Sequence, residues 1–368
     1  MVFAAYSNNS VNQYKNKNNI KSFECDDDDD RQTCVCKWPF IVVTTIALMF
    51  FLTFLITFIV FPIIFKCSPK LQKDFIFPIG KTYVENYFEY TNFQKHGMFG
   101  IRNLYVPLQN KDHITLGVWH ILPEDLMMNS TQSSFDYNNA LLNSNFPVLL
   151  YFHGGIGNRI TYLNSYKVLR KFFHVIAFDY RCYGDSSRGE LSETGIVNDS
   201  VALYEWLRLQ TKNEIYLWGY SLGCVLTTHT AAKLKKEKLI PAGVFLEAPF
   251  PTMIEQVQLL TFMPWFETTM LKPFNDHGFN YNTTEYIAQV DCPIAIIHAE
   301  DDMNVPFFLG FKLFDRLQYT RSSKQGNVTF YGLRHYFDVN TREVSAQKLT
   351  TIIRLHMNAC RQYMRIYG

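Results

Sequence analysis

The sequence has no long basic run, and its formal net charge is only +2 over 368 residues. A protein that binds nucleic acid needs a patch of positive charge to meet the phosphate backbone, so no nucleic-acid partner is indicated. Cysteine is also sparse in the large domain, where Cys182, Cys224, Cys292 and Cys360 show no Cys-x-x-Cys pair and no Cys/His ligand spacing. We therefore expect no metal site, no cofactor and no dense disulfide framework.

One long stretch, residues 40–61, has neither a charge nor a proline. Its 22 residues span roughly 33 Å as a helix, about the thickness of the hydrocarbon core of a bilayer. A buried core helix is rarely this long without a polar face, and "FPIIFKCSP" offers no small-residue cleavage site for a signal peptide. The sequence predicts a transmembrane signal-anchor helix over residues 38–65, with the lipid bilayer as a partner.

Two segments flank this helix. Residues 1–36, with five aspartates at 26–30, are predicted to be a disordered tail, and residues 66–96 a juxtamembrane linker. Lysines and arginines are similar in number on the two flanks, so charge leaves the orientation open. Four Asn-x-Ser/Thr sequons downstream would suit a glycosylated lumenal domain; they are Asn129, Asn198, Asn282 and Asn327.

Residues 97–368 alternate short apolar runs of strand length with amphipathic helical ones. Strands that are apolar on both faces and separated by helices indicate a mostly parallel sheet covered by helices, here with an antiparallel hairpin first. The predicted class is α/β. Residues 251–291 interrupt the alternation with an aromatic, apolar insertion, which is either an extra packed helix pair or a mobile lid.

The string "GYSLG" places Ser221 between two glycines, after the apolar run "EIYLW" and before a helical one. This is the pattern of a nucleophile elbow, a tight turn that projects the serine above the sheet and aims the Leu222 N–H at an oxyanion. The second oxyanion donor is expected in "YFHGGIGNR", where we favour the Gly155 N–H and keep Gly154 as a near alternative. His153 is expected to support that loop.

A serine hydroxyl needs a base, and the base needs an acid that orients it. Three carboxylates, residues 300–302, follow the run "PIAIIHA", and a solvated loop is the plain alternative reading. Asp302 is our choice because it stands four residues before Pro306, the D-x-x-V-P spacing of similar enzymes. His335, in "GLRH" after the last strand-like run, is the expected base.

The motifs "HGGIG", "FDYRCYGDS", "GYSLG", "HAEDDMNVP" and "GLRH" together resemble the α/β-hydrolase superfamily. Within it the chain resembles the membrane-anchored lysophosphatidylserine lipase and monoacylglycerol lipase branch. The resemblance implies a serine hydrolase of the α/β-hydrolase fold, with Ser221, Asp302 and His335 as triad. It also implies lysophospholipid or monoacylglycerol substrates and a lumenal or extracellular catalytic domain. We expect the endoplasmic reticulum, with the plasma membrane as the alternative.

Cys182 departs from the family pattern, since it stands where glycine is usual, and this puts substrate fit in question but not the triad.

Two other functions stay open. A palmitoyl-protein thioesterase would use the same triad, and the fold also serves as a non-catalytic receptor or adhesion module. Epoxide or haloalkane hydrolysis is disfavoured, because those enzymes need a carboxylate where Ser221 stands.

Overall fold

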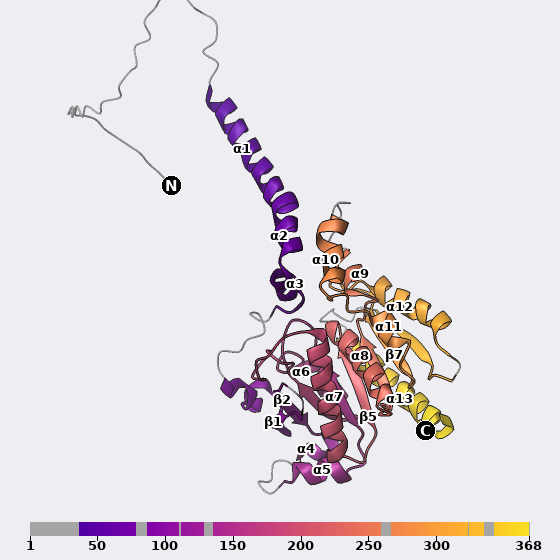
Figure 1. Cartoon of the computed structure of the whole chain (residues 1–368). Helices are drawn as coiled ribbons and strands as arrows, with labels where there is room; N and C mark the ends of the chain where they lie inside the picture. The colour runs from indigo at the N-terminus through magenta and orange to yellow at the C-terminus, as the bar shows by residue number, and fades with distance from the viewer. Residues whose placement is uncertain are drawn as a thin grey trace, which may run out of the picture. The chain divides into compact units, whose positions relative to one another are not determined.

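A computed structural model describes residues 37–78, 87–109, 112–128, 135–258, 266–322, 324–334 and 342–367 (Figure 1). The predicted tail, residues 1–36, lies outside them. By their contacts, the residues form two compact units, Met1–Ile56 and Thr57–Gly368.

The long apolar stretch is helical. It comprises α1 (Lys37–Leu55), the π-helical segment η1 (Ile56–Val60) and α2 (Phe61–Cys67). Over Trp38–Cys67 the mean hydropathy reaches 2.7 and only 11% of the most apolar window is buried. A core helix would be mostly buried, so this apolar helix is compatible with a single-pass membrane anchor.

The second unit contains one eight-stranded sheet in the order β1-β2-β4-β3-β5-β6-β7-β8. The strand β2 pairs antiparallel with both β1 and β4, and every other pair is parallel. The strands are β1 (Ile101–Pro107), β2 (Thr115–Ile121), β3 (Val148–Phe152), β4 (His174–Phe178), β5 (Ile215–Tyr220), β6 (Gly243–Glu247), β7 (Ile294–Ala299) and β8 (Val328–Leu333). The predicted α/β-hydrolase topology, a mostly parallel sheet that begins with an antiparallel hairpin, is confirmed.

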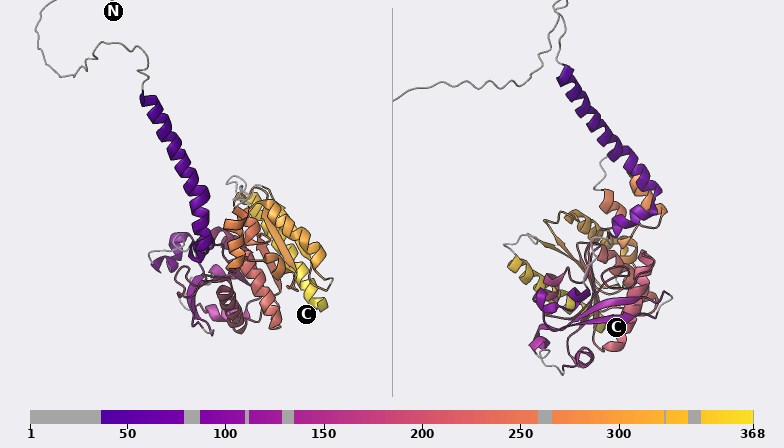
Figure 2. Two further views of the ribbon diagram at one scale, coloured as in Figure 1. Left: turned by 45° about the horizontal axis from the view of Figure 1, so that its top comes forward. Right: turned by 90° about the vertical axis from the view of Figure 1, so that its left-hand side faces the viewer.

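Helices lie on both sides of the sheet (Figure 2). Their bounds are α3 (Pro69–Ile76), η3 (Tyr87–Tyr90), η4 (Phe93–His96), α4 (Glu124–Met127), α5 (Tyr137–Asn143), α6 (Leu163–Leu169), α7 (Glu193–Gln210), α8 (Leu222–Lys236), α9 (Met253–Gln258), η6 (Glu267–Leu271), α10 (Lys272–Asp276), α11 (Thr283–Ile287), α12 (Phe307–Thr320) and α13 (Arg342–Tyr367).

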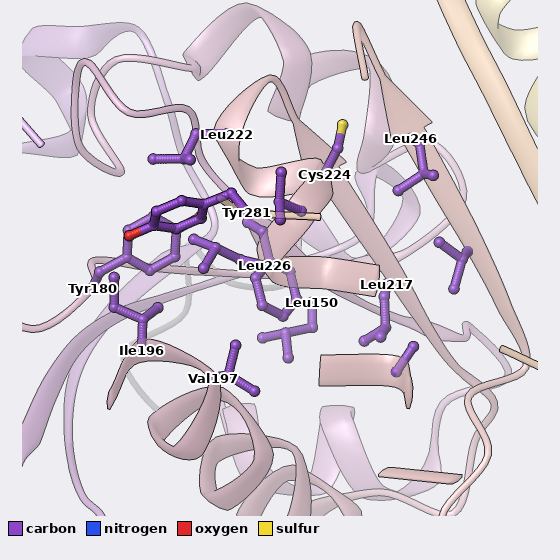
Figure 3. Packing of buried hydrophobic residues seen from close by; sticks show 14 of the residues in the cluster. Leu150, Tyr180, Ile196, Val197, Leu217, Leu222, Cys224, Leu226, Leu246 and Tyr281 are labelled. Atoms are coloured by element: carbon purple, nitrogen blue, oxygen red, sulfur yellow. The ribbon is translucent and has the colours of Figure 1, made fainter. Parts of the chain in front are cut away.

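Two apolar clusters flank the sheet. The larger one joins α7, α8 and α12 to one face, and the smaller one joins α6 and α13 to the other. In the larger cluster, Leu150 of β3 and Leu217 of β5 pack with Val197 of α7 and Leu226 of α8 (Figure 3). Strands β3 to β7 are buried on both faces, which explains their continuous apolar sequences.

The segment predicted as a linker contributes to this core. Ile76 at the end of α3 is 5% exposed and Phe77 is 1% exposed, and both belong to the larger cluster. The insertion at residues 251–291 contains α9, η6, α10 and α11. The predicted limits of the linker, the insertion and the catalytic domain remain predictions.

Candidate active site

Ser221 occupies the turn between the end of β5 and the start of α8, with φ 52° and ψ −119°. Few residues other than glycine adopt a positive φ, so the surroundings must hold this conformation. The Ser221 N–H donates to the Glu247 carbonyl at 2.9 Å, and the Cys224 N–H donates to the Ser221 carbonyl at 2.9 Å. The serine is thereby fixed at the N-terminus of α8 in a strained turn.

The two glycines of "GYSLG" are required by close backbone approach. A Cβ on Gly223 would lie 2.2 Å from the Phe152 carbonyl oxygen and 2.7 Å from that of His153. A Cβ on Gly219 would lie 2.6 Å from the Gly223 carbonyl oxygen. In real structures a Cβ atom does not lie closer than 3.0 Å to such a neighbouring heavy atom. Neither position therefore accepts a side chain without movement of the turn.

Ser221 lines a cavity of about 450 Å³, within the usual size range for small-molecule sites. Leu222 and Gly155, the two expected oxyanion residues, line it as well. The other lining residues are mostly apolar; they are Phe75, Ile76, Pro78, Gly154, Ile156, Thr161, Tyr162, Tyr220, Phe250, Met253, Gln256, Asn304 and Val305. The cavity can hold an apolar chain beside the serine.

The hydrogen bonds of the glycine loop distinguish the two candidate donors. The Gly154 N–H donates to the Tyr162 hydroxyl at 3.2 Å, so it is already engaged. Within the part of the chain that the structure describes, no acceptor is bonded to the N–H of Gly155 or of Leu222. Gly155 and Leu222 therefore stay the candidates for the two oxyanion donors.

His153 supports this loop as a neutral ring. Its Nδ1 donates to the Gly154 carbonyl at 2.7 Å, and its Nε2 accepts from the Tyr180 N–H at 3.5 Å, which assigns the tautomer. The ring stacks on Tyr180 with centroids 3.9 Å apart. Burial lowers the pKa of His153 from 6.5 to about 4, so the ring is uncharged near neutral pH.

A buried arginine, which the sequence analysis did not single out, fixes the far end of the same loop. The Arg159 N–H donates to Asp179 at 2.6 Å, and its guanidinium bonds to Asp179 and to both oxygens of Asp185, at 2.6 and 2.8 Å. Both carboxylates belong to the loop after β4. The only sign of this contact in the sequence is that charged residues stand directly after apolar strands. The pairing itself leaves no local pattern, because it joins residues that are distant in sequence.

Asp302 lies in the loop after β7, where it is 7% exposed. Its Oδ1 accepts from the N–H groups of Asn304 and Val305 at 2.8 and 2.9 Å. Glu300, by contrast, is exposed and pairs with Arg334 at 3.3 Å. Of these two candidate carboxylates, Asp302 is the one held in a fixed, buried position.

The Asp302 side chain lines a small recess beside the end of β5, together with Tyr220, Glu247 and Leu333. Glu247 is a second buried carboxylate there, and it accepts a hydrogen bond from Trp218 Nε1 at 3.0 Å. The sequence analysis does not include Glu247, although "FLEAPF" places an acid directly at a strand end. His298 donates from Nε2 to the Val305 carbonyl at 2.7 Å and so braces the acid loop.

The predicted base, His335, lies outside the described residues. Leu333, two positions earlier in the sequence, pairs with Ala299 and lines the recess that contains Asp302. The structure thus brings Ser221, Leu222 and Gly155 to one cavity and Asp302 to the adjoining recess. Over the described ranges, no three His, Cys, Asp or Glu side chains are grouped so that they could hold a metal ion.

Comparison with known proteins identifies the family. Residues 147–306 match the α/β hydrolase fold family. The chain is 30% identical to lysophosphatidylserine lipase ABHD12 of Xenopus tropicalis over 312 residues, 80% of each chain. It is 31% identical to that of Rattus norvegicus over 299 residues, which cover 77% of this chain and 74% of the rat protein. The chain belongs to the ABHD12 family of α/β hydrolases. The human protein ABHD12B is 31% identical over 55% of this chain and 58% of its own length.

Solved structures support the fold assignment of this ABHD12-family chain. An α/β hydrolase from Vibrio vulnificus matches with a TM-score of 0.55 at 14% identity, over 79% of this chain and 92% of its own. The Pyrococcus furiosus esterase PF2001 matches with a TM-score of 0.50 at 16% identity, over 72% of this chain and 93% of its own. At these identities the likeness shows the fold alone.

Cys182, the departure from the family motif, has φ 69°, a backbone conformation that glycine adopts without strain. Its thiol donates to the Gly189 carbonyl at 3.1 Å, and it does not line the cavity beside Ser221. The substitution therefore strains a loop near the site without adding a side chain to the cavity.

The four sequons of this ABHD12-family chain differ in how accessible their amides are. Asn198 lies within α7 and accepts a hydrogen bond from Lys233, and Asn282 caps α11 by accepting from the Glu285 N–H at 3.2 Å. Asn327 is exposed directly before β8. Asn129 lies outside the described residues. Among the three sequons that the structure describes, Asn327 is accordingly the acceptor that a glycan would disturb least.

Proposed function

We propose that this chain is a membrane-anchored serine hydrolase that cleaves fatty-acyl esters of lysophospholipids and monoacylglycerols. Lysophosphatidylserine, the substrate named for the ABHD12 relatives, is the substrate we propose first. The observation that carries the proposal is the strained turn at Ser221, which opens onto an apolar cavity beside the two candidate oxyanion donors. An elbow of this kind suits acyl transfer to a serine hydroxyl.

In the proposed reaction, His335 takes the proton of Ser221 while Oγ attacks the ester carbonyl. The N–H groups of Leu222 and Gly155 stabilise the tetrahedral oxyanion, and Asp302 orients the imidazole and stabilises its charged form. The imidazolium then protonates the departing glycerol oxygen, which leaves an acyl-enzyme on Ser221. Water, deprotonated by the same histidine, attacks this ester; the fatty acid departs and the serine recovers its proton.

The surroundings of Ser221 favour a long acyl group. Phe75, Ile76, Ile156, Phe250 and Met253 are among the apolar residues that line the cavity. Removal of each methylene group from water contributes about 0.8 kcal/mol, so such a lining selects for fatty-acyl esters over small ones. The apolar helix Trp38–Cys67 would keep the enzyme in the membrane that contains its substrate. We propose the endoplasmic reticulum, with the catalytic unit in the lumen.

The test uses full-length protein in detergent micelles. Wild-type protein is expected to release fatty acid from lysophosphatidylserine, and Ser221→Ala is expected to lose at least about 1,000-fold of that activity at equal expression. Turnover of a palmitoyl-cysteine peptide is measured in parallel. Retained lipase activity in Ser221→Ala would contradict the proposed nucleophile, and faster thioester than ester cleavage would contradict the proposed substrate class.

A further inference from the structure

The short helix α3 lies outside the family match at residues 147–306 and precedes the first strand of the sheet. It nevertheless forms one wall of the cavity beside Ser221, through Phe75 and Ile76. The Ile76 carbonyl oxygen lies 3.1 Å from the point where a Cβ on Gly155 would stand. The end of α3 thus packs directly against the oxyanion loop.

Aromatic contacts hold the end of α3 in place. The Phe77 ring lies edge-on to Tyr281 and Tyr183, with centroids 5.9 and 6.4 Å away. The Tyr183 hydroxyl donates to the Gly155 carbonyl at 2.9 Å. One tyrosine therefore contacts both the residue that follows α3 and the glycine loop, so the two walls of the cavity are braced together.

A buried amide ties α3 to two other segments. Gln72 is 0% exposed, and its Nε2 donates to the Phe65 carbonyl of α2 at 2.8 Å. Its Oε1 accepts from Nδ1 of His277 at 2.8 Å, and His277 caps the end of α10 in the insertion. A buried amide with its donor and acceptor both satisfied fixes the relative position of the segments that it joins.

From these contacts we propose that α3 is a substrate-binding element of the enzyme. Phe75 and Ile76 contact the acyl chain and set its preferred length, and Gln72 and His277 act as positioning residues for that wall. The inference rests on the proposed function, because it takes the cavity to be the acyl site. It assigns chain-length preference to a segment that begins two residues after the end of the apolar helix, not to the hydrolase fold alone.

The side chains of Ile76 and Phe75 differ in exposure, so we expect substitutions at the two positions to change chain-length preference in different ways. Ile76 is 5% exposed, so a larger residue there must project into the cavity and shorten it. Phe75 is 45% exposed, so its removal uncovers only part of an acyl chain. When a variant loses about 1 kcal/mol of the binding free energy that comes from apolar burial, kcat/KM falls roughly fivefold.

The experiment measures kcat/KM of full-length protein for p-nitrophenyl esters from butyrate to stearate. In Ile76→Trp, the stearate-to-butyrate ratio is expected to fall at least tenfold, and in Phe75→Ala about fivefold. Met303→Ala is the matched control, because Met303 is 92% exposed and does not line the cavity. If Ile76→Trp does not fold, as shown by loss of fluorophosphonate labelling, the fivefold fall expected in Phe75→Ala carries the test. An unchanged ratio in a labelled variant would overturn the proposal.

The positioning role has its own readout. Gln72→Met keeps the length of the side chain and removes both hydrogen bonds, so KM for the stearate ester is expected to rise severalfold more than kcat falls. An equal fall in kcat for all chain lengths would indicate general destabilisation and would contradict the positioning role. Because p-nitrophenyl esters report on any serine esterase, this series tests α3 even if lysophosphatidylserine proves to be the wrong headgroup.

Discussion

Gly223→Ala is the substitution whose effect follows most directly from the geometry of the elbow. Its Cβ would lie 2.2 Å from the Phe152 carbonyl oxygen, and an ordinary contact needs about 3.4 Å, so the turn and β3 must separate by about 1.2 Å. The obstructing atoms are backbone, and no side-chain rotation relieves the clash. Overpacking of this kind costs 1 to 3 kcal/mol or more, and we expect a loss near 3 kcal/mol. A displacement of about 1 Å at the nucleophile should lower activity about 100-fold.

The assay for Gly223→Ala follows the rate of fluorophosphonate labelling and the thermal midpoint of the purified full-length protein. Gly332→Ala in β8 is the matched control, because a Cβ there meets only side-chain atoms, at 3.3 Å and beyond. We expect this control to label at the wild-type rate. Normal labelling and an unchanged midpoint in Gly223→Ala would refute the reasoning that close backbone approach defines the elbow.

Three further predictions concern the acid, the orientation and the pH dependence. Asp302→Asn is expected to slow hydrolysis about 10,000-fold, whereas Glu300→Gln stays near wild type; equal effects in an activity assay would refute the choice of Asp302. In cells, Asn327→Gln should remove a glycosidase-sensitive gel shift that Asn198→Gln leaves in place, and a wild-type chain without any glycan would contradict a lumenal orientation. The pKa of His153 is lowered to about 4 by burial, so only the unfolded chain binds this proton as the pH falls below 6.5. The contribution of His153 to stability should be flat above pH 6.5 and fall by about 2 kcal/mol from pH 7 to 5, and a wild-type fall that is no steeper than that of His153→Gln would refute the assignment.

The centre of the sheet was predictable because strands β3 to β7 are buried on both faces and so appear as continuous apolar runs. The elbow was predictable for a similar local reason, since a strained turn between a strand and a helix demands glycine on both sides of the serine. The choice of Gly155 over Gly154 was made from the loop sequence alone. The hydrogen bond from Gly154 to Tyr162 supplies a physical reason for it that no local pattern contains.

Contacts between distant segments were not predictable. The bonds from Arg159 to the loop after β4, and from Gln72 to His277, join residues that are 20 to 205 positions apart. A single sequence carries no record of such pairs, and a glutamine between lysines, as in Lys70 to Lys73, resembles a solvated residue. The same limit explains why residues 66–96 were predicted as a linker, although α3 lies against the cavity.

The central claim is that the Ser221 hydroxyl is the nucleophile of the enzyme. The most direct measurement is to label the full-length protein with a fluorophosphonate, digest it, and locate the adduct by mass spectrometry. The account predicts one adduct, on the peptide that contains Ser221, and none after prior incubation with an excess of a long-chain lysophospholipid. An adduct on another serine, or an intact active chain without any adduct, would contradict it.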